Sequence, residues 1–218
     1  NEFVKKSYEI LKDHPVNKAR IAEGKAPANI ILPRGSGLAP DLTPLNERNN
    51  IKSACVAETG LIKGVAKYVG MDIIDVPEAT GGLDSDLIAM AKAIVKALED
   101  HNFVLCNVKG ADVGGHDASA QAKIDLIEKM DEMIGYLMKN SGAETYIALT
   151  ADHSTPVAVK DHSGDPVPIA FWGPGVRTDD VKHFDERSVT KGGVLRIRGT
   201  DVMNILTQLM TVQDKFGA

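Results

Sequence analysis

Short apolar runs alternate with longer amphipathic stretches from residue 51 onward. The short runs are rich in valine, isoleucine, alanine or aromatic residues and end at glycine, proline or aspartate, which predicts strands at residues 53–57, 72–76, 103–108, 146–150 and 168–171. Several of these runs are apolar on both faces, which is typical of strands in a buried parallel sheet. Because strand and helix signals alternate, the pattern predicts an α/β fold with helical crossovers between parallel strands.

The amphipathic stretches predict three helices in the same region. Residues 84–98 carry apolar side chains at helical spacing after an acidic cap candidate, and residues 118–139 repeat this pattern. A last helix is expected to run from Thr200, a candidate N-cap, to Leu209.

The first fifty residues have a different texture. A short helical pattern formed by Val4, Tyr8 and Leu11 precedes a passage rich in proline, glycine and asparagine, whose one strand-like run is residues 29–32. Because this loop-rich pattern gives way to alternating strand and helix patterns, we expect a domain boundary near residue 50, which separates residues 1–50 from residues 51–218.

Composition and charge narrow the possible partners. The 218 residues are 43% hydrophobic and include 25 Lys+Arg against 30 Asp+Glu, so global disorder is excluded. The net charge of −5 argues against a nucleic-acid partner, because such proteins concentrate basic residues on one face. With no membrane-length apolar run and no signal-peptide pattern, we expect a cytoplasmic protein that acts on a small molecule and has no membrane partner. The sequence leaves the oligomeric state open.

Three elements containing histidine and aspartate lie next to predicted strands. Asp112 and His116 follow the run 103–108 in a glycine-rich segment that is expected to be a loop. Asp152 and His153 follow the run 146–150, and His162 precedes the run 168–171. Loops at the carboxyl ends of strands form the ligand crevice of an open α/β sheet, so these side chains are expected to converge. Mixed imidazole and carboxylate donors suit Zn²⁺, Mn²⁺ or related divalent ions better than Ca²⁺.

The remaining histidines lack such a setting. His14, His101 and His183 are expected to be surface or capping residues, and Cys55 and Cys106, each in an apolar stretch, are expected to be core residues.

In these motifs, VKGADVGGHD, LTADHSTP and DHSGDPVPIAFWGPGV, the chain resembles the metal-dependent alkaline phosphatase superfamily. Two further stretches, HPVNKARIAEGKAPANIILPRGSG and AETGLIKGVAKYVGM, resemble the archaeal cofactor-independent phosphoglycerate mutases within it. The resemblance implies a three-layer α/β sandwich with a mostly parallel, alkaline phosphatase-like sheet. It also implies that residues 1–50 are the tail of an inserted substrate-binding domain, and that residues 51–218 are a metal-binding domain lacking its N-terminal segment.

The resemblance implies two divalent metal ions, whether Mn, Zn, Co or Mg. One ion would take Asp112, His116 and His162, and the other would take Asp152 and His153. The family's remaining ligands, an aspartate and the serine that accepts the phosphoryl group, belong to an upstream segment that has no match here. The chain is therefore expected to be the C-terminal part of an enzyme about twice as long, and to be inactive alone.

Two basic residues lie at or near positions where the family has residues that bind the substrate. Arg34 matches a substrate arginine, whereas the position of a second family arginine holds Gly37. Lys63 lies near the position of an active-site lysine. The resemblance thus implies interconversion of 3-phosphoglycerate and 2-phosphoglycerate through a phosphoserine, as in glycolysis and gluconeogenesis. Two alternatives stay open: a phosphomonoester or phosphonate hydrolase of the same superfamily, and a non-catalytic metal-binding fragment.

Overall fold

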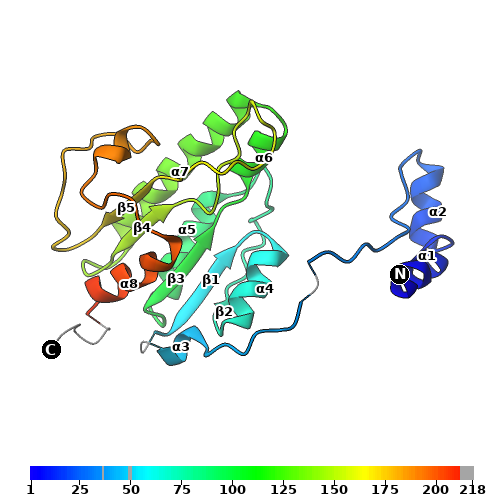
Figure 1. The fold of residues 1–218 in the computed structure, drawn as a ribbon, viewed down its shortest axis with the longest axis horizontal. Helices are drawn as coiled ribbons and strands as arrows, with labels where there is room; N and C mark the ends of the chain where they lie inside the picture. Colours follow the sequence, from blue (N-terminus) through cyan, green and yellow to red (C-terminus); the bar gives the residue numbers. More distant parts are fainter. Residues whose placement is uncertain (36, 49–50, 212–218) are drawn as a thin grey trace. The chain divides into compact units, whose positions relative to one another are not determined.

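The computed structural model describes residues 1–35, 37–48 and 51–211 (Figure 1). The chain forms two compact units, which divide between Asp41 and Leu42, whereas the sequence placed a boundary near residue 50. Within the described ranges, no helix combines the length and the apolar character that a membrane crossing requires.

The first unit contains two helices and an extended segment. Helix α1 (Glu2–Leu11) confirms the predicted helical pattern, and α2 (Pro15–Ala22) begins after His14, whose ring accepts a hydrogen bond from the backbone N–H of Val16. The predicted strand at 29–32 is wrong. Its backbone is held by side chains instead, since Ser7 Oγ accepts a hydrogen bond from Ile31 N at 3.0 Å.

Within the described residues, three parallel strands form one sheet of the second unit. They are β1 (Ser53–Ala57), β2 (Asp72–Ile73) and β3 (Phe103–Asn107), in the order β2-β1-β3. All three lie where the sequence predicted strands, although β2 is shorter than expected.

Two further strands of the part that the structure describes form an antiparallel pair. Strand β4 (Ile147–Thr150) pairs with β5 (Ile169–Trp172), and both confirm predicted strands. Parallel pairing needs a long crossover that is usually helical. Residues 151–168 contain no helix, so the chain returns through a loop and the second strand runs in the opposite direction.

Helices cover both faces of the parallel sheet. On one face, Val56 of β1 packs against α5 (Leu87–Ala97) and α7 (Ala120–Asn140). On the other face, Cys55 and Ala57 pack against α4 (Gly60–Tyr68), as Figure 1 shows. Successive residues of a strand point to opposite faces, so a fully buried β1 needs a helical layer on each side. The structure is therefore the expected three-layer α/β sandwich. Helix α8 (Gly199–Leu209) and three shorter elements also belong to the described part of the unit: α3 (Leu45–Arg48), α6 (Gly110–His116) and η1 (Ser188–Lys191).

Three of the helices confirm sequence predictions, with one change of cap. Side chains of Asp86 and Ser119 accept hydrogen bonds from backbone N–H groups in the first turns of α5 and α7. Helix α8 is capped by Arg198 rather than by the predicted Thr200. Its first turn is closed by Asp201, whose Oδ2 accepts a hydrogen bond from Arg198 N at 2.8 Å.

The glycine-rich segment after β3 is helix α6, not the predicted loop. Glycine disfavours helices, but here small size is needed for close packing. A Cβ on Gly114 would lie 3.2 Å from the backbone of Lys123 in α7, and a Cβ on Gly115 would collide with the Thr155 carbonyl oxygen. The helix places Asp112 and His116 one turn apart on the same face.

Candidate metal centre

Three potential ligand atoms converge beside α6. Asp112 Oδ1 lies 3.4 Å from His116 Nε2 and 3.4 Å from His162 Nε2. Ligand atoms of a tetrahedral ion that are each about 2.1 Å from it lie roughly 3.4 Å apart. Because one oxygen and two nitrogens of these residues all lie within 4.8 Å of one another, the three side chains fit a single divalent ion.

The carboxylate of Asp112 is shielded and ionised. Its side chain is 11% exposed, and it accepts hydrogen bonds from Lys109 Nζ at Oδ2 and from Thr155 Oγ1 at Oδ1, the latter at 2.6 Å. Burial raises the pKa of Asp112, but these hydrogen bonds and the charges of Lys109 and His116 outweigh it and hold the pKa at about 2. Asp112 therefore needs no deprotonation before it binds a cation.

His116 is oriented by the loop that also carries His162. Nδ1 of His116 lies 3.0 Å from the backbone carbonyl oxygen of Lys160, which can only accept a hydrogen bond. The proton of a neutral His116 is thus expected on Nδ1. Nε2 then carries a lone pair, which faces Asp112. Lys160 adopts a φ of 60°, and a bridge between Ser154 and Ser163 closes the loop.

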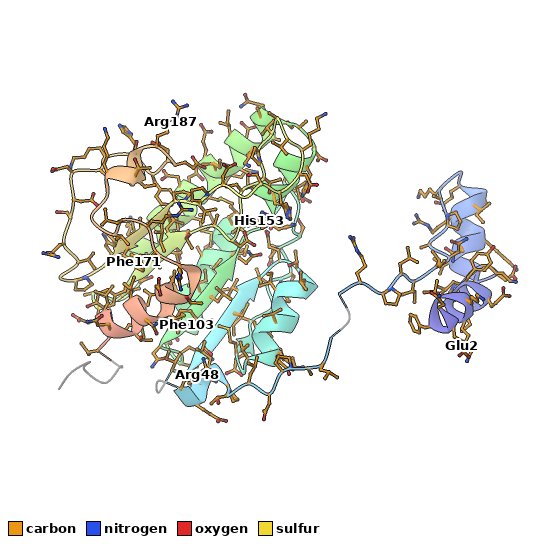
Figure 2. The ribbon with its side chains drawn as sticks, viewed as in Figure 1. Glu2, Arg48, Phe103, His153, Phe171 and Arg187 are labelled. Atoms are coloured by element: carbon orange, nitrogen blue, oxygen red, sulfur yellow. The ribbon has the colours of Figure 1, made fainter. Side chains whose placement is uncertain are left out.

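The other predicted pair lies alongside. His153 Nε2 is 3.8 Å from Asp152 Oδ2, and His153 Nδ1 is 4.0 Å from Asp112 Oδ1. The rings of His153 and His162 stack with centroids 3.8 Å apart, and Figure 2 labels His153 beside α6. The structure thus brings Asp112, His116, His153 and His162 together, whereas Asp152, among the described residues, contacts only its neighbour His153. The role of all five residues as metal ligands stays a prediction.

The two predicted substrate contacts belong to different units of the chain. Arg34 is an exposed residue of the first unit. Lys63 lies on α4, where its Nζ forms an ion pair with Asp75 Oδ1 at 2.8 Å. Their roles in substrate binding also stay predictions.

Sequence reasoning missed two polar residues near the centre. The carboxylate of Glu58, directly after β1, accepts hydrogen bonds from Lys109 N at the start of α6 and from Ser85 Oγ. Glu58 lies at the carboxyl end of a strand, which is the same pattern that identified Asp152. It could therefore have been predicted from the sequence as a candidate site residue. Thr155 carried no such signal, because its contact with Asp112 spans distant parts of the chain.

The chain is similar to known metalloenzymes over most of its length. The family model described as Metalloenzyme superfamily matches residues 12–209. Over the whole chain, 56% of residues are identical to a 2,3-bisphosphoglycerate-independent phosphoglycerate mutase of Methanothermobacter thermautotrophicus, and 54% to one of Methanosphaera stadtmanae.

Two solved structures share the fold. A protein of Pyrococcus horikoshii is 46% identical, with a TM-score of 0.89 over all of this chain and 57% of its own. The cofactor-independent phosphoglycerate mutase of Thermoplasma acidophilum is 34% identical, with a TM-score of 0.62 over 96% of this chain and 50% of its own. The chain spans about half the length of the curated relatives, 53% of each of the two named above.

Proposed function

Because this chain belongs to the Metalloenzyme superfamily, we propose that it supplies the metal-binding part of an enzyme that interconverts 3-phosphoglycerate and 2-phosphoglycerate. The observation that carries the proposal is the convergence of Asp112, His116 and His162 at spacings that fit one divalent ion. The relatives named as phosphoglycerate mutases support the choice of reaction.

Two divalent ions are proposed, with Mn²⁺ or Zn²⁺ suited to the donors. Asp112, His116 and His162 would hold the first ion, and Asp152 and His153 would contribute to the second. Bound together, such ions neutralise phosphoryl oxygens and lower the pKa of a hydroxyl nucleophile.

The residues of this chain have defined tasks in the proposed reaction. Asp112 presents one oxygen toward the imidazoles while Lys109 occupies the other, so the carboxylate has a fixed orientation. Arg34 and Lys63 are proposed to bind the anionic groups of phosphoglycerate, because guanidinium and ammonium groups pair with phosphate and carboxylate.

The proposed reaction transfers the phosphoryl group twice. The oxygen of a serine attacks the phosphorus of 3-phosphoglycerate, the bond from phosphorus to the 3-oxygen breaks, and that oxygen takes up the proton that the serine loses. After glycerate reorients, its 2-oxygen attacks the phosphorus of the phosphoserine. The bond from phosphorus to the serine oxygen breaks, and the proton of the 2-hydroxyl restores the serine hydroxyl. We propose that the serine belongs to a segment that precedes this chain in the full-length protein, and that the first unit is the tail of the substrate-binding domain.

An enolase-coupled assay of the metal-loaded full-length protein tests the proposal. Formation of 2-phosphoglycerate from 3-phosphoglycerate, without added bisphosphoglycerate, is the expected result. Release of free phosphate without 2-phosphoglycerate would instead identify a phosphomonoester hydrolase. Turnover by the 218-residue chain alone would contradict the requirement for an upstream serine.

A further inference from the structure

A buried threonine hydroxyl lies between the two groups of candidate ligands. Thr155 is 4% exposed, and its Oγ1 lies 2.6 Å from Asp112 Oδ1 and 3.2 Å from His153 Nδ1. Asp112 is a proposed ligand of the first ion, and His153 is a proposed ligand of the second ion. This one hydroxyl therefore connects side chains of both groups.

The single proton of the hydroxyl decides how the two contacts are made. An ionised carboxylate can only accept hydrogen bonds, so Thr155 must donate its proton to Asp112. The contact with His153 then requires the ring to donate, which places the proton of the neutral imidazole on Nδ1. Nε2 of His153 is left with a lone pair, 3.8 Å from Asp152 Oδ2.

The backbone of Thr155 is fixed by two neighbours. Lys123 of α7 donates from Nζ to the Thr155 carbonyl oxygen at 2.8 Å. Gly115 of α6 packs so closely against the same carbonyl oxygen that a Cβ there would collide with it, and would lie 2.8 Å from Thr155 Cγ2. The hydroxyl is thus held in place by α6 and α7.

We propose that Thr155 is a positioning residue that keeps His153 in the tautomer whose Nε2 is free to bind a divalent cation together with Asp152. The inference rests on the proposed metal-dependent function, because a free Nε2 matters only if a cation binds there. Groups that orient a metal-binding imidazole through its second nitrogen commonly change metal affinity by roughly 10- to 100-fold when removed.

The tautomer is measurable without metal. In the metal-free full-length protein labelled with ¹⁵N-histidine, two-bond ¹H–¹⁵N correlation spectra distinguish a protonated Nδ1 from a protonated Nε2, and His153→Gln assigns the signals. We expect Nδ1–H at His153 in the wild type and in Thr155→Ser, which keeps the hydroxyl. In Thr155→Val, we expect a mixture of both tautomers.

Mn²⁺ binding provides the second readout. Thr155→Val is expected to weaken the ion held by Asp152 and His153 by roughly 10- to 100-fold, and Thr155→Ser to stay near the wild type. Thr155→Ala, which cannot overpack the site, carries the same expectation as the valine variant. Thr207→Val is the matched control, because Thr207 is another buried threonine and its hydroxyl donates to Met203 O within α8.

The outcomes separate the inference from the function on which it rests. Wild-type tautomer and wild-type Mn²⁺ affinity in folded Thr155→Val and Thr155→Ala would overturn the inference and leave the metal centre in place. A wild-type protein that binds no Mn²⁺ would overturn both.

Discussion

Glu58 holds the first turn of α6 to the end of β1, because its carboxylate accepts a hydrogen bond from the backbone N–H of Lys109. Its other oxygen accepts a hydrogen bond from Ser85 Oγ, ahead of α5. The helix that carries Asp112 is thus tied to the parallel sheet by one side chain.

Removal of this tie is expected to weaken both the fold and the metal centre. Glu58→Ala leaves Lys109 N without its acceptor, and such a loss costs about 1–3 kcal/mol. Urea unfolding should show this decrease, and Mn²⁺ titration should show weaker binding. Glu58→Gln, which keeps one acceptor oxygen, should lose less than Glu58→Ala. Equal stability of Glu58→Ala and of the surface control Glu99→Ala would contradict the role of Glu58.

Loss of single candidate ligands tests the metal centre itself. His116→Ala and Asp152→Ala in the full-length protein are expected to lose metal and activity together, because each removes a donor from a different ion. Metal content after dialysis, measured by plasma emission spectrometry, should fall in both variants. His183→Ala, an exposed histidine away from the cluster, is the control. Full metal stoichiometry in both ligand variants would remove the assignment.

The contribution of ionised Asp112 to the free energy of unfolding should be lost at low pH. Its pKa of about 2 lies below the unfolded value of about 3.9, so the ionised folded state is favoured above the unfolded pKa, and this contribution is lost as the pH falls toward 2. The difference corresponds to roughly 2–3 kcal/mol. Urea unfolding of metal-free protein between pH 7 and the acid limit should therefore show a steeper loss for the wild type than for Asp112→Asn. Asp131→Asn, an exposed aspartate of α7, should follow the wild type. Parallel curves for the wild type and Asp112→Asn would contradict the expectation.

Two glycine-to-alanine changes should have opposite signs. Gly115→Ala forces a Cβ against the Thr155 backbone, so overpacking is expected to cost about 1–3 kcal/mol in the free energy of unfolding. Gly135→Ala lies in α7 with no heavy atom within 4 Å of the added Cβ, and should stabilise by about 0.5–1 kcal/mol. Equilibrium urea denaturation measures both. A neutral Gly115→Ala would show that α6 shifts freely away from Thr155.

Much of the fold was readable from local patterns. The strands β1 and β3 and the helices α5 and α7 follow from apolar periodicity, which is a property of short segments. The strand at 29–32 failed because strand pairing needs a partner, and its backbone is instead satisfied by side chains such as Ser7. Helix α6 was missed because glycine lowers helix propensity, and only packing against α7 and Thr155 makes glycine favourable there.

The sequence by itself determined the α/β fold, the family and the side chains that converge beside α6, since residue type and position after a strand carry that information. The tertiary structure decided which oxygen of Asp112 faces the imidazoles, that Thr155 Oγ1 lies within hydrogen-bond distance of both Asp112 and His153, and that Glu58 contacts the start of α6. These are contacts between residues far apart in the chain, for example positions 112 and 155, and they exist only once packing has fixed both ends. Hydrogen-bond direction depends on such fixed geometry, so no local pattern contains it.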